Sequence, residues 1–217
     1  MRSLELRMYD PYDMPYRSSG ISRVRFSERE LRDIAISVAV LTLAFTLVFI
    51  RWYPLYSDFV TNFLVWLGIC LAIVLSGFVL HELGHKFAAQ HYGAWAEYRM
   101  FPQGLILALL ISLLGVLFAA PGAVYIRGMI DRRQNGIISL AGPGVNLIIG
   151  AVSLLLALTL SGTAGFVMYM LARINLILAV FNLIPFPPLD GSKILKWNPL
   201  VFTLAFVSGI VMFLLAY

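Results

Sequence analysis

The chain has 217 residues, of which 60% are hydrophobic and 12% are charged, and its mean hydropathy is +0.87. A soluble domain is usually about 45–50% apolar and about 25% charged, so this composition excludes an ordinary soluble domain and indicates an integral membrane protein. The formal charge of +5 fits basic residues that gather in cytoplasmic flanks and loops, and no feature suggests nucleic-acid binding. The single cysteine, Cys70, excludes a disulfide framework and thiolate zinc sites, so a metal must use histidine and carboxylate.

Residues 1–33 are rich in arginine and contain no apolar segment, which predicts an exposed cytoplasmic arm rather than a cleavable signal peptide. A spanning helix needs roughly 17–25 residues, so most of the uncharged stretches that follow can cross a bilayer. These stretches lie at residues 34–50, 59–80, 105–126, 136–172 and 197–217. Helix-breaking residues predict the ends of the spans. Tyr92-Gly93 is expected to stop the second helix, Ser161-Gly162-Thr163 to divide the fourth stretch into two spans, and Asn198-Pro199 to open the last helix.

The stretch at residues 105–126 decides the topology. With the arginine-rich arm inside, the first span exits and the second returns; a full crossing by 105–126 would then place the later basic loops outside, against the charge rule for cytoplasmic loops. We therefore expect this segment to be re-entrant or strand-like, with residues 120–126 extended and the backbone lining protein or a water-filled cavity. The predicted fold is an all-α polytopic membrane protein with five to six transmembrane helices and a short re-entrant or β-strand element between the second and third full spans.

The motif His81-Glu82-Leu83-Gly84-His85 ends the second apolar stretch. Residues four apart project from one face of a helix about 6 Å apart, so His81 and His85 can share one zinc ion. Glu82 lies too far round the helix to be a natural ligand but can reach a water molecule on the metal, which is the general-base position of the H-E-x-x-H pattern. A carboxylate near the middle of a bilayer costs about 2.5–3.5 kcal/mol on insertion scales, which favours a functional reading of the motif.

A catalytic zinc site has three protein ligands and an open position, so a further ligand is needed. His91 imitates the spacing of some soluble metalloproteases, but it lies off the His81 face if the helix continues, and an interfacial role suits it better. Asp131 stands beside two arginines and reads as a solvated loop charge. Asp190 follows a run of prolines and precedes Gly191, so its carboxylate can be held rigidly on the side of the membrane where His81 lies.

The pair of motifs H-E-L-G-H at residues 81–85 and N-x-x-P-x-x-x-L-D-G at residues 182–191 resembles the site-2 protease family of intramembrane zinc metalloproteases. The resemblance covers roughly residues 60–195 and includes Gly-Pro-Gly-Val-Asn at residues 142–146. It implies that His81, His85 and Asp190 bind one zinc ion per chain and that Glu82 is the catalytic acid/base. It also implies strand-like elements between the two motifs that pair with an unwound substrate.

The sequence does not decide the roles of two asparagines. Asn182 and Asn146 are candidates to support the substrate or the oxyanion, and the alternative for each is a helix-capping or inter-helix hydrogen bond. The sequence divides into the arm at 1–33, a first span and loop at 34–58, an intramembrane metalloprotease core at 59–195 and a last span at 196–217.

The predicted function is hydrolysis of a peptide bond near the cytoplasmic end of a transmembrane protein substrate, in the lipid bilayer of the cell membrane, with the N-terminus in the cytoplasm. The alternatives are a metal or proton transporter and an inactive zinc-binding scaffold; the oligomeric state is left open.

Overall fold

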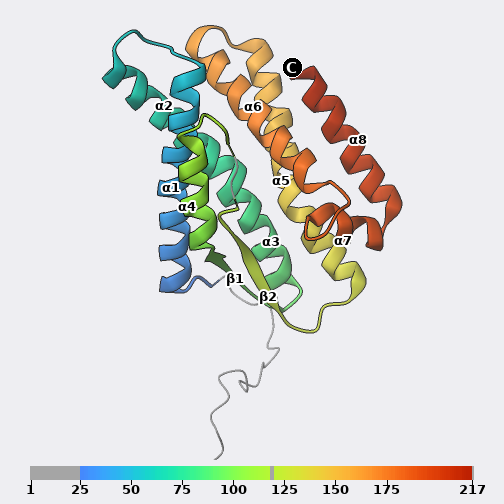
Figure 1. Cartoon of the computed structure of the whole chain (residues 1–217). Coiled ribbons are helices and arrows are strands. Elements are labelled where there is room, and N and C mark those ends of the chain that lie inside the picture. Colours follow the sequence, from blue (N-terminus) through green and yellow to red (C-terminus); the bar gives the residue numbers. More distant parts are fainter. Residues whose placement is uncertain (1–24, 118–119, 217) are drawn as a thin grey trace, which may run out of the picture.

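The computed structural model describes residues 25–117 and 120–216, which form a bundle of long helices with a small two-stranded sheet between α1 and α3, toward the end where α1 begins (Figure 1). The elements are, in chain order, α1 Glu28–Trp52, α2 Phe59–Val74, a π-helical turn Leu75–Val79, α3 Leu80–His91, β1 Trp95–Met100, α4 Pro102–Ser112, β2 Gly122–Arg127, α5 Arg132–Thr159, α6 Gly162–Asn182, α7 Asp190–Trp197 and α8 Pro199–Leu215. A core of buried apolar side chains centred on Trp66 fills the space between α1, α2 and α6.

Four helices in the described part of the chain are long and apolar enough to cross a membrane: α1, the continuous helix Phe59–His91, α5 and α6. Helix α8 has 17 residues and is therefore about 26 Å long, at the lower limit for a crossing. The expected ends are present, because Gly93 takes a positive φ of 77° after α3 and the Asn198 side chain caps α8. The prediction of an all-α polytopic membrane protein is confirmed.

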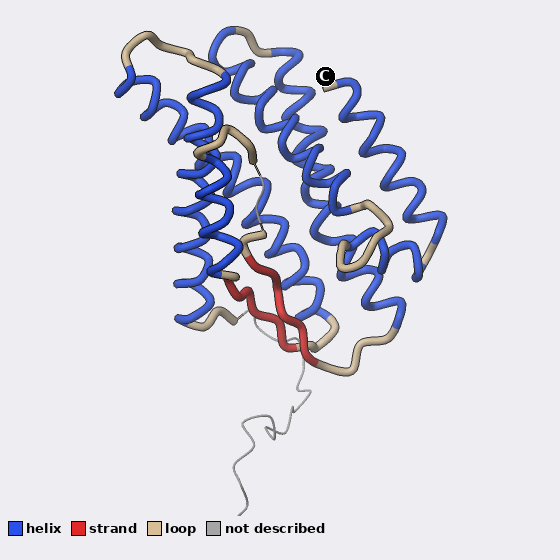
Figure 2. The backbone as a smooth tube through the Cα atoms, viewed as in Figure 1, coloured by secondary structure: helices blue, strands red, loops and turns tan. Residues whose placement is uncertain are grey.

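The segment between the two strands enters and leaves the fold at the same place. The Phe101 N–H donates to the Pro121 carbonyl at 2.7 Å, and β1 pairs with β2 antiparallel, from Trp95 opposite Arg127 to Met100 opposite Gly122. The tip reaches the far end of α1, where the Trp52 indole donates to the Gly115 carbonyl at 2.8 Å. The segment is therefore re-entrant, as the charge rule predicted, and Figure 2 shows it leaving and rejoining the sheet.

The two halves of this re-entrant hairpin differ. The extended half was expected at residues 120–126 and is found as β2, Gly122–Arg127. The other half, residues 102–112, forms α4, with Pro102 in its first turn and exposed apolar side chains along it. A helix satisfies its own backbone hydrogen bonds, so α4 needs no partner strand.

The beginning of α1 braces the sheet. Glu30 accepts the backbone N–H of Tyr98 at 3.0 Å and Asp33 accepts that of Met100 at 3.4 Å. Residues 28–33, which the sequence placed in an exposed arm, instead form the first turns of α1, and their two carboxylates at Glu30 and Asp33 are buried. The rest of that arm, residues 1–24, lies outside the described residues. Helix α1 thus occupies the outer edge of β1. The outer edge of β2 faces α3.

Lys86 joins this brace to α3. Its Nζ lies 2.5 Å from the Glu30 carboxylate, donates to the Ala96 carbonyl at 3.2 Å and sits 4.3 Å from the centre of the Phe26 ring. Both members of the ion pair are almost completely buried, with side-chain exposures of 1% and 0%. Removing one member of such a pair leaves an uncompensated buried charge.

We expect Lys86→Met alone to lower the free energy of unfolding by about 3–5 kcal/mol, because it leaves the buried Glu30 carboxylate without a positive partner. The double variant Lys86→Met/Glu30→Gln should recover part of that loss, since the charge and its partner leave together. Loss of helical circular dichroism during denaturation in detergent measures both. A Lys86→Met protein as stable as the parent would contradict the conclusion that the buried Lys86–Glu30 ion pair stabilises the fold.

Candidate metal centre

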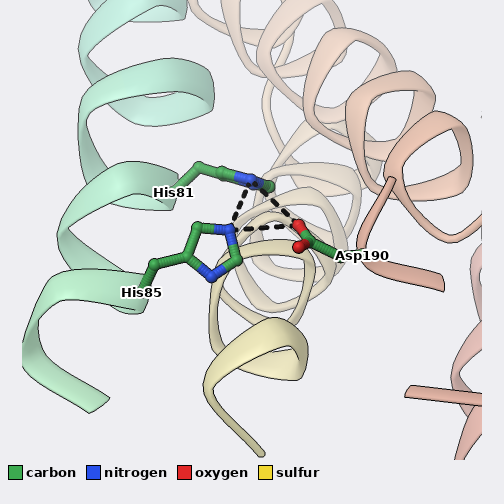
Figure 3. A group of neighbouring side chains, drawn as sticks. All are labelled: His81, His85 and Asp190. Atoms are coloured by element: carbon green, nitrogen blue, oxygen red, sulfur yellow. Dashed lines mark hydrogen bonds and ion pairs between the residues drawn. The ribbon is translucent and has the colours of Figure 1, made fainter. Parts of the chain in front are cut away.

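His81 and His85 stand one helical turn apart on α3, and their rings meet edge to face (Figure 3). The Nε2 atoms of the two rings are 3.1 Å apart, and both side chains are buried. The helical spacing expected from the sequence therefore brings the two imidazole nitrogens to one point.

Asp190 reaches the same point from the other end of the chain. It is the first residue of α7, after a non-helical segment that contains Pro185 and the cis peptide bond Pro187–Pro188. One carboxylate oxygen lies 3.1 Å from His85 Nε2 and 3.7 Å from His81 Nε2. Gly191 permits the sharp entry into α7, because a Cβ there would lie 2.1 Å from the Leu183 carbonyl oxygen.

The second nitrogen of each ring has a defined partner. His85 Nδ1 lies 2.8 Å from the Ile138 carbonyl, which can only accept, so Nδ1 carries the proton. His81 Nδ1 lies 2.7 Å from Asn146 Oδ1, and the Asn146 amide group donates to the Gly77 carbonyl at 2.9 Å and to Asn175 Oδ1 at 3.2 Å. Because the amide nitrogen faces two acceptors, its oxygen must face His81, whose Nδ1 is then also the donor. In the neutral rings, both Nε2 atoms present lone pairs to each other.

The three atoms fit a zinc ion. Ligand atoms about 2.0–2.1 Å from a tetrahedral zinc lie about 3.3 Å from one another. The distances here are 3.1, 3.1 and 3.7 Å, and two nitrogens and a carboxylate oxygen are an ordinary donor set for zinc. Lone pairs and a negative charge that face one another in a buried site are costly unless a cation or a proton lies between them, and a zinc ion would satisfy all three groups at once. Among the described residues, His81, His85 and Asp190 form the one group of three or more such side chains able to share a metal ion.

Comparisons with known proteins identify the family. A model described as Peptidase family M50 matches residues 161–198. A protein of Methanocaldococcus jannaschii named "Putative zinc metalloprotease" is 41% identical over 190 residues, which cover 85% of this chain and 92% of that protein. The chain belongs to peptidase family M50, the site-2 protease family.

Further relatives match shorter parts of the chain. A second M. jannaschii protein, named "Zinc metalloprotease", is 32% identical over 62% of this chain and 35% of its own length. A Bacillus subtilis protein named "Putative zinc metalloprotease" is 33% identical over 57% of this chain and 65% of its own length. No solved structure shows a significant match to the chain. Residues 161–198, which the family model matches, include α6 and the Asp190 segment.

Glu82 of this M50 protein stands apart from the three clustered side chains and faces the sheet. Its carboxylate accepts the backbone N–H of Val124 in β2 at 3.1 Å. The backbone N–H of Val124 therefore points away from β1 and toward α3. The contact fixes the Glu82 carboxylate at the free edge of β2, one residue along the helix from His81.

Two glycines allow α5 to approach the histidines closely. A Cβ on Gly142 would lie 2.3 Å from His85 Nε2 and 2.7 Å from His81 Nε2. Gly84, inside the H-E-L-G-H motif, faces the Ala141 carbonyl of the same α5 segment, where a Cβ would lie 2.8 Å from the oxygen. The backbone of α5 thus forms one wall of the cluster, and any side chain at residue 142 would fill the space between the rings.

Asn146, Asn175 and Ser76 form a buried polar network that sequence reasoning did not assemble. The Asn175 side-chain oxygen, on α6, accepts a hydrogen bond from the Asn146 amide. The Asn175 amide nitrogen donates to Ser76 Oγ at 3.1 Å and to the Leu171 carbonyl at 2.9 Å. Ser76 and Gly77 belong to the π-helical turn that precedes the motif, and the Gly77 carbonyl in this turn accepts the Asn146 amide. An asparagine inside an apolar span was the signal that could have drawn attention to Asn175.

The remaining candidates lie elsewhere. Asn182 donates to the Leu178 carbonyl of its own helix at 2.9 Å. His91 packs its ring against Tyr92 at the end of α3 and is outside the metal-ligating group. Asp131 caps α5 through a capping box with Gln134 rather than serving only as a loop charge. Lys193, one turn after Asp190, lies 3.1 Å from the carboxylate oxygen that faces away from the histidines.

Proposed function

We propose that this chain is an intramembrane zinc endopeptidase in which His81, His85 and Asp190 bind one zinc ion and Glu82 is the general base and acid. The observation that carries the proposal is the convergence of the two Nε2 atoms and one Asp190 oxygen within 4.8 Å, with both Nδ1 positions held by acceptors. Acceptors on the outer nitrogens of histidine ligands fix the ring orientation and raise the basicity of the ligating nitrogen.

When bound, zinc would supply Lewis-acid chemistry, which polarises a substrate carbonyl and lowers the pKa of a water molecule. Glu82 is suited to take the proton from that water and to pass it to the leaving amine. Its position supports this role, because the Val124 N–H orients the carboxylate while it remains outside the set of ligating atoms. Lys193 holds the second oxygen of Asp190 at 3.1 Å and so keeps the first one turned toward the histidines.

The free edge of β2 suggests how a substrate is presented. In an antiparallel pair, alternate residues direct their N–H and C=O groups away from the partner strand. On β2 these groups lie on the edge that faces α3 and Glu82, as the Val124 contact shows. An unwound segment of a transmembrane protein can add to such an edge as an extended strand, which would place a peptide bond beside Glu82. Helix-breaking glycine or proline in the substrate would favour the unwinding.

The proposed orientation places the N-terminus, the sheet and the metal-ligating cluster toward the cytoplasm. Basic residues support it, because Arg99, Arg127 and Lys193 belong to β1, β2 and α7, and these elements lie in the half of the molecule where α1 begins (Figure 1). Cleavage would then occur near the cytoplasmic end of the substrate helix. Residues 59–195 would form the catalytic core in the cell membrane.

Chelation tests the proposal. Purified full-length protein in detergent micelles is incubated with a transmembrane peptide that contains a central glycine pair, and the products are identified by mass spectrometry. We expect cleavage toward the cytoplasmic end of the peptide, its loss with 1,10-phenanthroline and its return with added zinc. Cleavage that is indifferent to the chelator, or zinc transport into proteoliposomes by a protein that cleaves nothing, would contradict the proposal.

Asn146 gives a second test through zinc affinity. Asn146→Ala removes the acceptor that holds the His81 Nδ1 proton, and we expect an affinity loss of about 10–100-fold, typical for a lost partner of a histidine ligand. Competition with a chromophoric chelator measures the affinity. Asn182→Ala is the matched control, because that side chain bonds only its own helix in the contacts described. Equal affinities for the two variants would rule out a positioning role for Asn146.

A further inference from the structure

A cavity lined by both charged and aromatic side chains lies on the outer face of the sheet, away from the histidine cluster. Its volume is about 400 Å³, within the range of about 300–1,000 Å³ that small-molecule sites occupy. The lining includes Arg29 and Asp33 of α1, Trp95 and Arg99 of β1, and Tyr125 and Arg127 of β2. Nothing in the proposed peptidase chemistry uses these side chains.

The pairing of the strands explains why these side chains gather. Trp95 lies opposite Arg127 and Arg99 lies opposite Ala123, so the odd-numbered residues of both strands share one face. The even-numbered residues of β1 face the core, where Ala96 and Tyr98 are buried. Arg29, one turn before Asp33 on α1, completes the wall of the cavity.

The charge around the cavity is net positive. Arg29, Arg99 and Arg127 line it together with Asp33, and Glu97 pairs with Arg99 on the same face of β1, which leaves a formal excess of one positive charge. The Asp33 carboxylate is already engaged with the Met100 N–H at 3.4 Å. Arg99 pairs with Glu97, and Arg127 lies over the Trp95 ring at 5.6 Å, so both side chains are held in place. Clustered arginines are suited to phosphate, which they bind through paired N–H donors.

The surroundings indicate a lipid source for that phosphate. Pro102 lines the cavity and is the first residue of α4, whose outward face exposes Ile106, Leu110 and Leu113 by 61%, 57% and 59%. These residues are spaced by four and three, so they form one apolar stripe that leads from the cavity toward the tip of the hairpin. Trp95 and Tyr125 are residues that favour the membrane interface.

We propose that this cavity binds the phosphate headgroup of an anionic phospholipid, with the acyl chains lying along α4. A bound lipid would contact α1, both strands and the re-entrant hairpin together, so it would fasten the hairpin to the sheet. The site is separate from the metal-ligating cluster and does not depend on the proposed peptidase activity.

The experiment compares lipid binding by the purified full-length protein in detergent, using native mass spectrometry with dioleoylphosphatidylglycerol or dioleoylphosphatidylcholine. We expect at least about tenfold preference for the anionic lipid. Each basic residue near an anionic headgroup is worth about fivefold in affinity, so Arg29→Gln/Arg127→Gln should bind phosphatidylglycerol about 25-fold more weakly. Arg29→Lys/Arg127→Lys should retain part of the affinity, because the charge remains.

Arg133→Gln/Lys196→Gln is the matched control, because it removes two exposed basic side chains outside the cavity lining and should leave the preference intact. Unchanged thermal unfolding of the glutamine variants shows that they fold. Equal binding of the two lipids, or an undiminished preference in Arg29→Gln/Arg127→Gln, would overturn the proposal. So would displacement of phosphatidylglycerol by equimolar glycerol phosphate, which would assign the cavity to a soluble phosphate ligand instead.

Discussion

Glu82→Gln is expected to bind zinc as the parent does and to lose peptide hydrolysis by about 10²–10⁴-fold, the usual contribution of a general acid–base group. Glutamine has nearly the same shape, and its amide oxygen can still accept the Val124 N–H, so the helix and the strand edge should remain in place. The amide cannot take a proton from water at neutral pH. The variant thus removes the proposed proton transfer while the three ligating side chains stay unchanged.

The measurement combines zinc content by elemental mass spectrometry with the rate of cleavage of a transmembrane peptide. Glu97→Gln is a suitable control, because it makes the same chemical change on β1, where the carboxylate pairs with Arg99 and Ser27. A zinc-loaded Glu82→Gln protein that cleaves at the parent rate would refute the proposed mechanism. Loss of zinc in this variant would instead make Glu82 a ligand and contradict its assignment as the base.

Asp190→Ala is expected to lose zinc more severely than any other single change considered, with an affinity reduction beyond the about 10–100-fold cost of losing an outer partner. The carboxylate supplies the one negative charge among the three proposed zinc ligands and the one contact from α7. Without it, His81 and His85 hold two nitrogens on a single helix, which is an incomplete set for catalytic zinc. Hydrolysis should fall with the metal content.

Titration of each protein with zinc against a competing chelator measures this effect. Asp131→Ala is the control, because that carboxylate caps α5 and takes no part in the cluster. It should weaken the helix by about 1 kcal/mol through the lost cap and leave zinc affinity unchanged. Equal zinc affinity in Asp190→Ala and the parent would show that the third ligand is another group.

For the re-entrant hairpin, the loop charges predicted the topology but not the secondary structure of each half. The excess of arginine and lysine in the later loops was enough to reject a full crossing by residues 105–126, because a crossing would have moved those charges across the membrane. The strand at Gly122–Arg127 was also expected. The helix at Pro102–Ser112 was not, since an apolar run of that length is compatible with either conformation until its neighbours are known.

The first turns of α1 show a different limit. Residues 28–33 look like part of a charged arm, and isolated buried carboxylates are costly. In the fold, Glu30 meets Lys86, 56 residues away, and the backbone of β1, which offset that cost. Asn175 is similar: an asparagine in an apolar span indicates a polar contact, but its partners Asn146 and Ser76 come from two other helices. Such pairings follow from which helices pack together.

The sequence by itself determined the membrane class, most span boundaries and the alignment of His81 with His85, because hydropathy and helical periodicity are local properties of the chain. Only the tertiary structure decided that an Asp190 oxygen lies 3.1 Å from His85 Nε2, that Asn146 orients His81, and that Gly142 leaves room between the rings. These contacts join α3, α5 and α7, so they depend on the packing of distant segments, which no local pattern specifies.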